Sequence, residues 1–275
     1  MKSSDSIIYP FFASLLFAVS AVQAQVTAIN NGYHEWGSAE WTAGVPMGDA
    51  TAFLNDNTHV NLSDGSTVSL RGVRIGNVTS STAKLNVDKG LMELSYVVVG
   101  NSPNSNALYY QSGGMLNIAD TQYIDFDIGS GEGPATAPCT SQAVFEGGTA
   151  NLADVRFNLS SERSNSLVIN GSAIEISANL LTAEPKGTSW QKGTLEFNFD
   201  RRGISTLKVA SGVVLGEKDK FILKVDGSDY VGNKSRFVLI EAGYISGQFA
   251  EIVIEGFEED ASVYAEDNNI VLTIP

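Results

Sequence analysis

The chain has 275 residues, with 17 Lys and Arg against 31 Asp and Glu, so its formal net charge is −14. This acidity disfavours nucleic acids and anionic membranes as partners, because both are polyanions. A single cysteine, Cys139, excludes an intrachain disulfide, and 43% hydrophobic residues are too many for a disordered chain.

Residues 1–24 have the pattern of a secretory signal peptide. Lys2 supplies a basic start, an apolar stretch follows over 7–22, and Val22 and Ala24 stand at the −3 and −1 positions of a cleavage site. The apolar stretch is shorter than the roughly 20 residues that a membrane span needs. We therefore expect an exported protein with no stable membrane span after cleavage. The alternative is that the segment is retained as an anchor.

Tryptophans mark the start of the expected mature chain. Trp36 and Trp41 are predicted to cap the first open coil of the fold, each burying about 150–250 Å². The alternative for these two residues, and for Trp190, is stacking on sugar rings.

Strand signals dominate the rest of the first part. Short runs alternate apolar and polar residues, which is typical of strands with one buried face. Gly, Asn, Ser and Pro residues separate the runs and turn the chain. The clearest predicted strands are 83–87, 124–128, 155–159 and 174–178.

One unit occurs twice: GGMLNIAD at 113–120 returns as GGTANLAD at 147–154. A repeat at this spacing, composed of residues that are typical of β-strands, indicates stacked coils. One coil of about 30 residues cannot bury its inward side chains alone. Coils stacked about 4.8 Å apart pair each strand with those above and below it. Asn117 is then expected over Asn151 in an amide ladder, with their apolar neighbours facing inward.

A second signal alternates with the first. Strands end in an aliphatic residue and a glycine at 75–76, 99–100 and 128–129, so the interval between these glycines is not constant. The variable interval between these glycines indicates coils of constant cross-section with loops of variable length at one corner.

Aligning Ile124 with Val155 predicts the outer face of two adjacent coils. In this alignment Asp125 lies opposite Arg156, and Asp127 lies opposite Asn158.

The pattern of predicted strands changes near Leu181, and the loop 182–188 is a candidate domain boundary. We therefore divide the mature chain into β-helix repeats over 25–181, including the tryptophan cap, and irregular coils or a β cap over 182–275. A terminal element is expected because the edges of a stack need to be covered. The strands predicted in this last part are 194–200, 206–209, 221–226, 237–240, 252–255 and 270–274.

Motifs at both ends of the mature chain resemble exported bacterial β-solenoid repeat proteins. Trp36, EWTAGVP (40–46) and DATAFL (49–54) are similar to the opening of such proteins, in which units like QSGGML (111–116) follow. The segments FVLI, ISGQF and NIVLT (237–240, 245–249 and 269–273) resemble the end of autotransporter passenger domains. The resemblance, which extends to PEP-CTERM-type surface proteins, implies a parallel β-helix displayed on a bacterial cell or released from it. It implies no shared catalytic residues.

The predicted fold is therefore all-β: a single-stranded parallel β-helix, or right-handed β-solenoid, with a C-terminal β-rich cap. The right hand is expected because parallel β connections are overwhelmingly right-handed.

Candidate reactive groups are few. Asp125 and Asp127 have the spacing of a catalytic carboxylate pair or of Ca²⁺ ligands, but alternation on a solvated strand face explains them as well. The acidic run 258–260 is expected in a solvated turn. Arg201 and Arg202 are expected in a turn with local charge pairing, the alternative being an anion or uronate site.

Cys139 is expected to be a small, partly buried loop residue. A catalytic thiol needs a basic partner, and the two histidines, His34 and His59, are far away in sequence. We therefore predict no catalytic, cofactor or metal site.

The favoured hypothesis is an exported, non-enzymatic β-solenoid with a structural or adhesive role at the cell surface or in the extracellular matrix. Its expected partners are extracellular polysaccharides or cell-surface components. One alternative is a polysaccharide lyase or hydrolase, which shares the scaffold, although a fold does not imply a function. The other is a carbohydrate-binding module that uses exposed aromatic rings such as Tyr109 and Tyr110.

Overall fold

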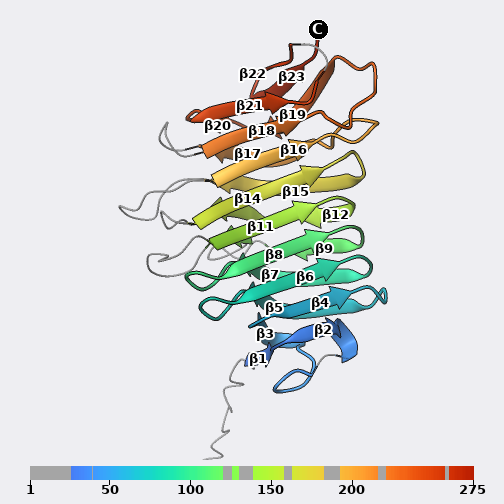
Figure 1. The fold of residues 1–275 in the computed structure, drawn as a ribbon, viewed down its shortest axis with the longest axis vertical. Coiled ribbons are helices and arrows are strands. Elements are labelled where there is room, and N and C mark those ends of the chain that lie inside the picture. The colour runs from blue at the N-terminus through green and yellow to red at the C-terminus, as the bar shows by residue number, and fades with distance from the viewer. Residues whose placement is uncertain are drawn as a thin grey trace, which may run out of the picture.

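The computed structural model describes residues 26–38, 40–119, 126–129, 139–157, 163–182, 193–215, 221–257 and 260–275. The chain winds into a stack of flattened coils that follow one another along an elongated molecule (Figure 1). Each coil adds strands to two sheets, which we name sheet A and sheet B. Neighbouring coils are joined by parallel pairing, so the predicted β-solenoid is confirmed.

Sheet A contains the longest row of strands. Its order is β1 (Val26–Ile29), β3 (Gly48–Leu54), β5 (Thr67–Ile75), β7 (Leu91–Val99), β10 (Phe126–Ile128), β13 (Asp154–Phe157), β15 (Ile174–Thr182), β17 (Leu207–Val214), β19 (Arg236–Ala242), β23 (Asn269–Thr273) and β22 (Ser262–Glu266). Among the described residues, three coils add a second short strand to this sheet: β9 (Met115–Ile118), β12 (Gly148–Asn151) and β20 (Ile245–Ser246).

Sheet B contains the other strand of each coil, and all its described pairs are parallel. Its order is β2 (Gly32–Glu35), β4 (Thr58–Leu62), β6 (Thr82–Val87), β8 (Asn106–Gln111), β11 (Cys139–Phe145), β14 (Arg163–Asn170), β16 (Gly193–Asn198), β18 (Phe221–Asp226) and β21 (Glu251–Glu255).

The repeated Gly-Gly unit stacks on itself as predicted. Asn117 of β9 pairs with Asn151 of β12, and the Asn151 amide donates to the Asn117 side-chain oxygen at 3.1 Å. In the same register Leu116 lies over Ala150, and both are fully buried. The interval between the two copies of the unit therefore measures one coil of the stack.

Glycines let adjacent coils approach closely at the corner before β12. A Cβ on Gly147 would lie 2.3 Å from the carbonyl oxygen of Ser112, and one on Gly148 would lie 2.2 Å from that of Gly114. Gly148 also has a positive φ of 84°. A larger residue here would push the coils apart, which explains why the unit begins with two glycines.

The aliphatic-glycine signal marks a corner at the end of the sheet A strands. Ile75 pairs with Val99, and Val99 pairs with Ile128, so the three strand ends lie in one column. The glycines that follow have φ values of 70°, 80° and 83°. Their variable spacing therefore reflects loops of different length between identical corners.

A single apolar core lies between the two sheets and runs through the stack. In the middle coils it contains the rings of Tyr109, Phe126 and Phe145, with centroids 5.4–5.8 Å apart. The Tyr109 hydroxyl donates to the Gln111 side-chain oxygen at 3.0 Å, and the Gln111 amide donates to the Thr149 carbonyl at 3.0 Å. These buried polar groups are thus hydrogen-bonded, as the low-dielectric interior requires.

The first coil is closed by its own chain. Trp36, in the 3-10 helix η1 (Trp36–Ser38), and Trp41 are 3% and 7% exposed, with ring centroids 5.1 Å apart. Thr42 covers the edge of β1: its N–H donates to the Ala28 carbonyl at 2.9 Å, and its hydroxyl accepts from the Ala28 N–H at 3.0 Å. Both tryptophans that were predicted to cap this coil are therefore buried.

Beyond Thr182 the parallel pairing continues through β16, β17 and β18 to β19 and β21. The strand direction then reverses, because β23 pairs antiparallel with β19, and β22 pairs antiparallel with β23. The hairpin β22–β23 forms the C-terminal end of sheet A (Figure 1).

One predicted register is wrong. Val155 pairs with Phe126 and not with Ile124, so Asp127 lies opposite Arg156 rather than Asn158. Phe126 and Val155 are both fully buried, so the core column they share sets the pairing. The two alignments differ by two residues, so both keep the same side chains on the core face, and alternation alone does not distinguish them.

Candidate functional site

The outer face of sheet B carries a series of neighbouring side chains in its first coils. Because strand residues alternate between faces, Val60, Leu85 and Tyr109 point into the core while their neighbours point outward. We define the outer band as Tyr33 (β2), His59 (β4), Lys84 (β6), Tyr110 (β8) and Glu146, which follows β11.

Register and contacts join the members of the outer band. Tyr33, His59 and Lys84 are paired in one column across β2, β4 and β6. The rings of Tyr33 and His59 meet edge to face, with centroids 4.6 Å apart. Tyr33 is 76% exposed, so most of its ring is open to solvent.

The second part of the outer band is a charged chain of contacts. The Lys84 ammonium lies 4.9 Å from the centre of the Tyr110 ring, a cation–π distance. The Tyr110 hydroxyl donates to the Glu146 carboxylate. From Tyr33 to Glu146 the band crosses four coil steps, or about 19 Å at about 4.8 Å per step.

These contacts shift two pKa values. The hydrogen bond to Glu146, aided by burial and the negative charges of Glu146 and Asp88, raises the pKa of Tyr110 to about 12. Burial, aided by the charge of Lys84, lowers the pKa of His59. At neutral pH the band therefore presents a protonated phenol and a neutral imidazole, both able to form hydrogen bonds.

Only one of the two tyrosines proposed for sugar binding lies on the surface. Tyr109 is fully buried in the core, which corrects the expectation that its ring is exposed. Tyr110 is partly exposed on the outer face of β8. The two adjacent residues point to opposite sides of the strand, and the phenol of Tyr109 finds its partner in the buried Gln111.

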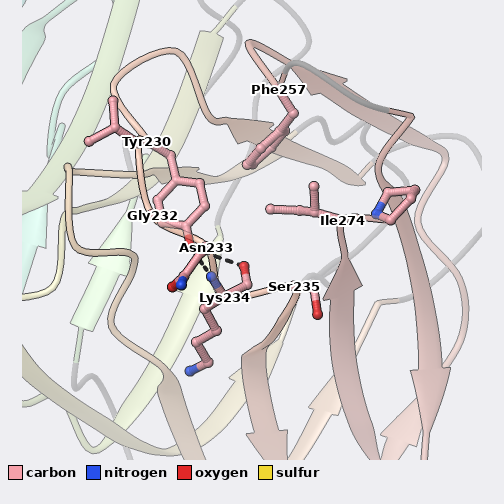
Figure 2. A pocket seen from close by; sticks show the side chains of 9 residues that line it. Tyr230, Gly232, Asn233, Lys234, Ser235, Phe257 and Ile274 are labelled. Carbon is pink, nitrogen blue, oxygen red and sulfur yellow. Dashed lines mark hydrogen bonds between the residues drawn. The ribbon is translucent and has the colours of Figure 1, made fainter.

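A cleft of about 330 Å³ lies at the C-terminal end of the molecule. It is lined by Tyr230, Val231, Gly232, Asn233, Lys234, Ser235, Phe257, Ile274 and Pro275. The Tyr230 hydroxyl donates to the Lys234 carbonyl at 2.9 Å and accepts from the Lys234 N–H at 2.8 Å, which fixes the loop (Figure 2).

The cleft has both an apolar and a polar wall. Figure 2 shows Tyr230, Phe257 and Ile274 around it, while the Lys234 side chain points away from Phe257 and Ile274. The Lys234 ammonium instead lies 4.7 Å from the centre of the Phe237 ring. The charge of Lys234 is therefore directed away from the apolar wall of the cleft.

Asp127, expected on a solvated face, is only 5% exposed. It lies between Val98 and Arg156 in the outward column of sheet A, and Val98 is also buried. Arg156 in turn pairs with Asp154 at 3.4 Å. The expectation of a solvated Asp127 is therefore wrong.

Arg201 and Arg202 lie in an exposed turn with local charge pairing, as expected. Asp200 accepts hydrogen bonds from the backbone N–H groups of Arg202 and Gly203 at 2.7 and 2.9 Å, and the Arg202 side chain lies 3.8 Å from its carboxylate. Burial alone would raise the pKa of Asp200, but the hydrogen bonds from Ser172, Arg202 and Gly203 outweigh it and lower the pKa.

Cys139 is 3% exposed at the start of β11, more buried than a loop residue would be. Strands β6 and β8 separate it from β4, which carries His59. The acidic Asp260 is exposed, as predicted. The predictions for residues 1–24, Asp125, Trp190, Glu258 and Glu259 lie outside the described residues.

Within the ranges that the structure describes, no group of three or more His, Cys, Asp or Glu side chains is placed to share a metal ion. Across the same ranges, no helix is long and apolar enough to cross a membrane.

Most of the outer band was not expected from the sequence. His59 was considered only as a basic partner for the Cys139 thiol, and Tyr33 and Lys84 were not candidates. A signal is present, because Tyr33, His59 and Lys84 follow one another at nearly equal intervals along the chain, one coil each. This regular spacing becomes visible when the sequences of successive coils are aligned with one another.

In comparisons with known proteins, the chain matches no family model, no curated protein and no solved structure.

Proposed function

We propose that the chain is exported and acts as a non-enzymatic structural and adhesive rod at the cell surface or in the extracellular matrix. The observation that carries the proposal is the linking of polar side chains from coil to coil. The amide of Asn77 donates to Asn55 at 3.3 Å, and that of Asn101 donates to Asn77 at 2.7 Å. This asparagine ladder ties together three coils at one corner.

Similar links recur along the stack. Asn198 donates to Asn170 at 3.0 Å, farther along the stack than the Asn117–Asn151 pair. Near the C-terminal end, Lys224 bridges Glu196 at 3.8 Å and Glu255 at 3.2 Å. Each link contributes only about 1 kcal/mol. Together they hold neighbouring coils in one register, which suits a rod that must keep its shape.

The outer band supports the adhesive part of the proposal. It presents the ring of Tyr33 and the polar groups of His59, Lys84 and Tyr110 along one flat sheet face. A row of this length matches an extended ligand, such as a polysaccharide chain, better than a small molecule. Tyrosine suits such a surface because it combines an apolar ring with a polar tip.

Cell fractionation with an epitope-tagged full-length chain tests export. We expect the mature chain outside the cytoplasm, shortened at its N-terminus. A chain that stays in the cytoplasm at full length contradicts the proposal.

Sedimentation with insoluble and soluble polysaccharides tests adhesion. We expect binding that falls at least fivefold in Tyr33→Ala and is unchanged in Tyr264→Ala, which alters a 40% exposed tyrosine on β22. Equal loss in both variants would remove the outer band from the proposal. Release of shortened or unsaturated sugars from the same panel would instead establish an enzyme.

A further inference from the structure

The two sheets end differently at the C-terminal end of the stack. Sheet A continues past β19 through the antiparallel strands β23 and β22. Sheet B ends at β21, since no strand among the described residues pairs with its outer side. An uncovered edge presents unpaired N–H and C=O groups, which are a template for another strand.

The pairing of β21 shows which of its backbone groups face the open edge. The Gly227 N–H donates to the Glu255 carbonyl at 2.8 Å, so Glu255 is directed at β18. Alternate residues of a parallel strand bond to the same neighbour, which directs the backbone groups of Ile252 and Ile254 away from β18. These two residues therefore offer hydrogen bonds to an added strand.

The side chains of β21 also indicate a missing neighbour. Ile252 continues the core column of Leu223, which is fully buried, yet Ile252 is 44% exposed. Glu251 and Glu255 flank the strand on its outward side, and the Glu255 side chain is 50% exposed despite its contact with Lys224. The edge is thus apolar on its core side and negative at both ends.

We propose that β21 accepts an extended segment of a partner protein as the next strand of sheet B. The segment that fits has aliphatic residues opposite Ile252 and Ile254, and Lys or Arg opposite Glu251 and Glu255. Opposite charges across paired strands are favourable, and like charges are not. Strand addition of this kind obtains affinity from main-chain hydrogen bonds and specificity from alternate side chains.

A second copy of this chain fits the edge less well. Antiparallel pairing of β21 with itself would place Glu251 beside Glu255 at both ends. The other open edge of sheet B, β2, has Glu35 and contains no Lys or Arg. The hairpin β22–β23 also extends sheet A beyond the level of β21, where the first coil of a stacked copy would have to lie.

The test uses the purified full-length chain and a labelled synthetic peptide of alternating Lys, Val and Thr residues. The control peptide has Glu in place of Lys. We expect saturable binding of the basic peptide, at least tenfold tighter than that of the acidic one, and slower amide hydrogen exchange at Ile252 and Ile254. The double variant Glu251→Lys/Glu255→Lys should reverse the preference.

A matched control is Glu93→Lys, which reverses an exposed charge on β7 and should leave binding unchanged. If the double variant does not fold, Glu251→Gln should still weaken binding of the basic peptide. Binding without protection of Ile252 and Ile254 would overturn the proposal, as would equal affinity for both peptides. Self-association that protects the same amides would assign the edge to a second copy instead.

Discussion

The N-terminal and C-terminal ends of the stack are closed in different ways. At the first coil, Trp36 and Trp41 cover the core and Thr42 pairs with the edge of β1, so closure uses side chains and a local loop. At the last coil, the chain reverses direction, and the hairpin β22–β23 extends sheet A. Thr42 thus covers part of the β1 edge, while at the other end β22 becomes the last strand of sheet A; β2 and β21 are the outer strands of sheet B among the described residues.

The comparison shows two ways in which a stack of coils can shield its core at its ends. A solenoid is required to shield its core at both ends and to limit edge pairing. Here the core is shielded by rings at one end and by a hairpin at the other. In the interaction that we propose, the charged side chains of β21 restrict which strands pair with the open edge of sheet B.

The largest effect is expected from breaking the N-terminal end. Trp36→Ala should lower the free energy of unfolding by about 3–5 kcal/mol, because it removes a buried ring that covers the core. Urea unfolding followed by circular dichroism measures the change. The control is Tyr33→Ala, on the neighbouring strand and largely exposed, which should change stability by less than about 0.5 kcal/mol. Similar losses in both variants would contradict the assigned cap.

A matched pair in one core column tests how open the C-terminal end is. Leu223→Ala should cost about 2–5 kcal/mol, because Leu223 is fully buried between β16 and β21. Ile252→Ala, one coil later, should cost about 1 kcal/mol, because much of that side chain already contacts water. Equal costs in the same urea experiment would mean that β21 is covered in solution.

A smaller effect is expected at the loop that borders the C-terminal cleft. Tyr230→Phe removes a hydroxyl that forms two hydrogen bonds with the Lys234 backbone, and should lower stability by about 1 kcal/mol. Thermal unfolding with Tyr33→Phe as the reference measures it. If the reference variant loses as much, the hydrogen bonds do not hold this loop.

The smallest effect concerns pH, and it also separates the two ends. Burial, with the charge of Lys84, lowers the pKa of His59 below its unfolded value of 6.5, so the folded state resists protonation. Stability should therefore fall as the pH drops below about 6.5. In His59→Gln the loss between pH 7.5 and 5.5 should be smaller, as measured by urea unfolding at both values.

At the C-terminal end the acid response lies at lower pH. Burial would raise the pKa of Asp226, but hydrogen bonds from Ser228 and the charge of Lys224 outweigh it, and the pKa lies below its ordinary value of 3.8. The ionised Asp226 side chain therefore stabilises the folded state fully above pH 3.8, and this stabilisation is lost only as the pH falls through the lowered pKa. Asp226→Asn should therefore leave the change between pH 7.5 and 5.5 unaltered. A change equal to that of His59→Gln would contradict this separation.

Some of the structure could be predicted from sequence because it depends on local chemistry repeated in each coil. The alternation of apolar and polar residues predicted the ends of strands such as β6 and β18 to within one residue. The Gly-Gly unit predicted the register of Asn117 with Asn151. Identical units stack in register because each packs best on a copy of itself. The burial of Trp36 and Trp41 was also expected, since an open coil needs a large apolar cover.

Tertiary structure decided what depends on neighbours outside the repeat. Phe126, and not Ile124, pairs with Val155; the two alignments differ by two residues, so the alternation of apolar and polar residues fits both. Tyr109 turned out to be buried, because the rings of the adjacent coils and the amide of Gln111 surround it. The row from Tyr33 to Glu146 also needed the stack, which brings side chains that are far apart in the chain onto one face.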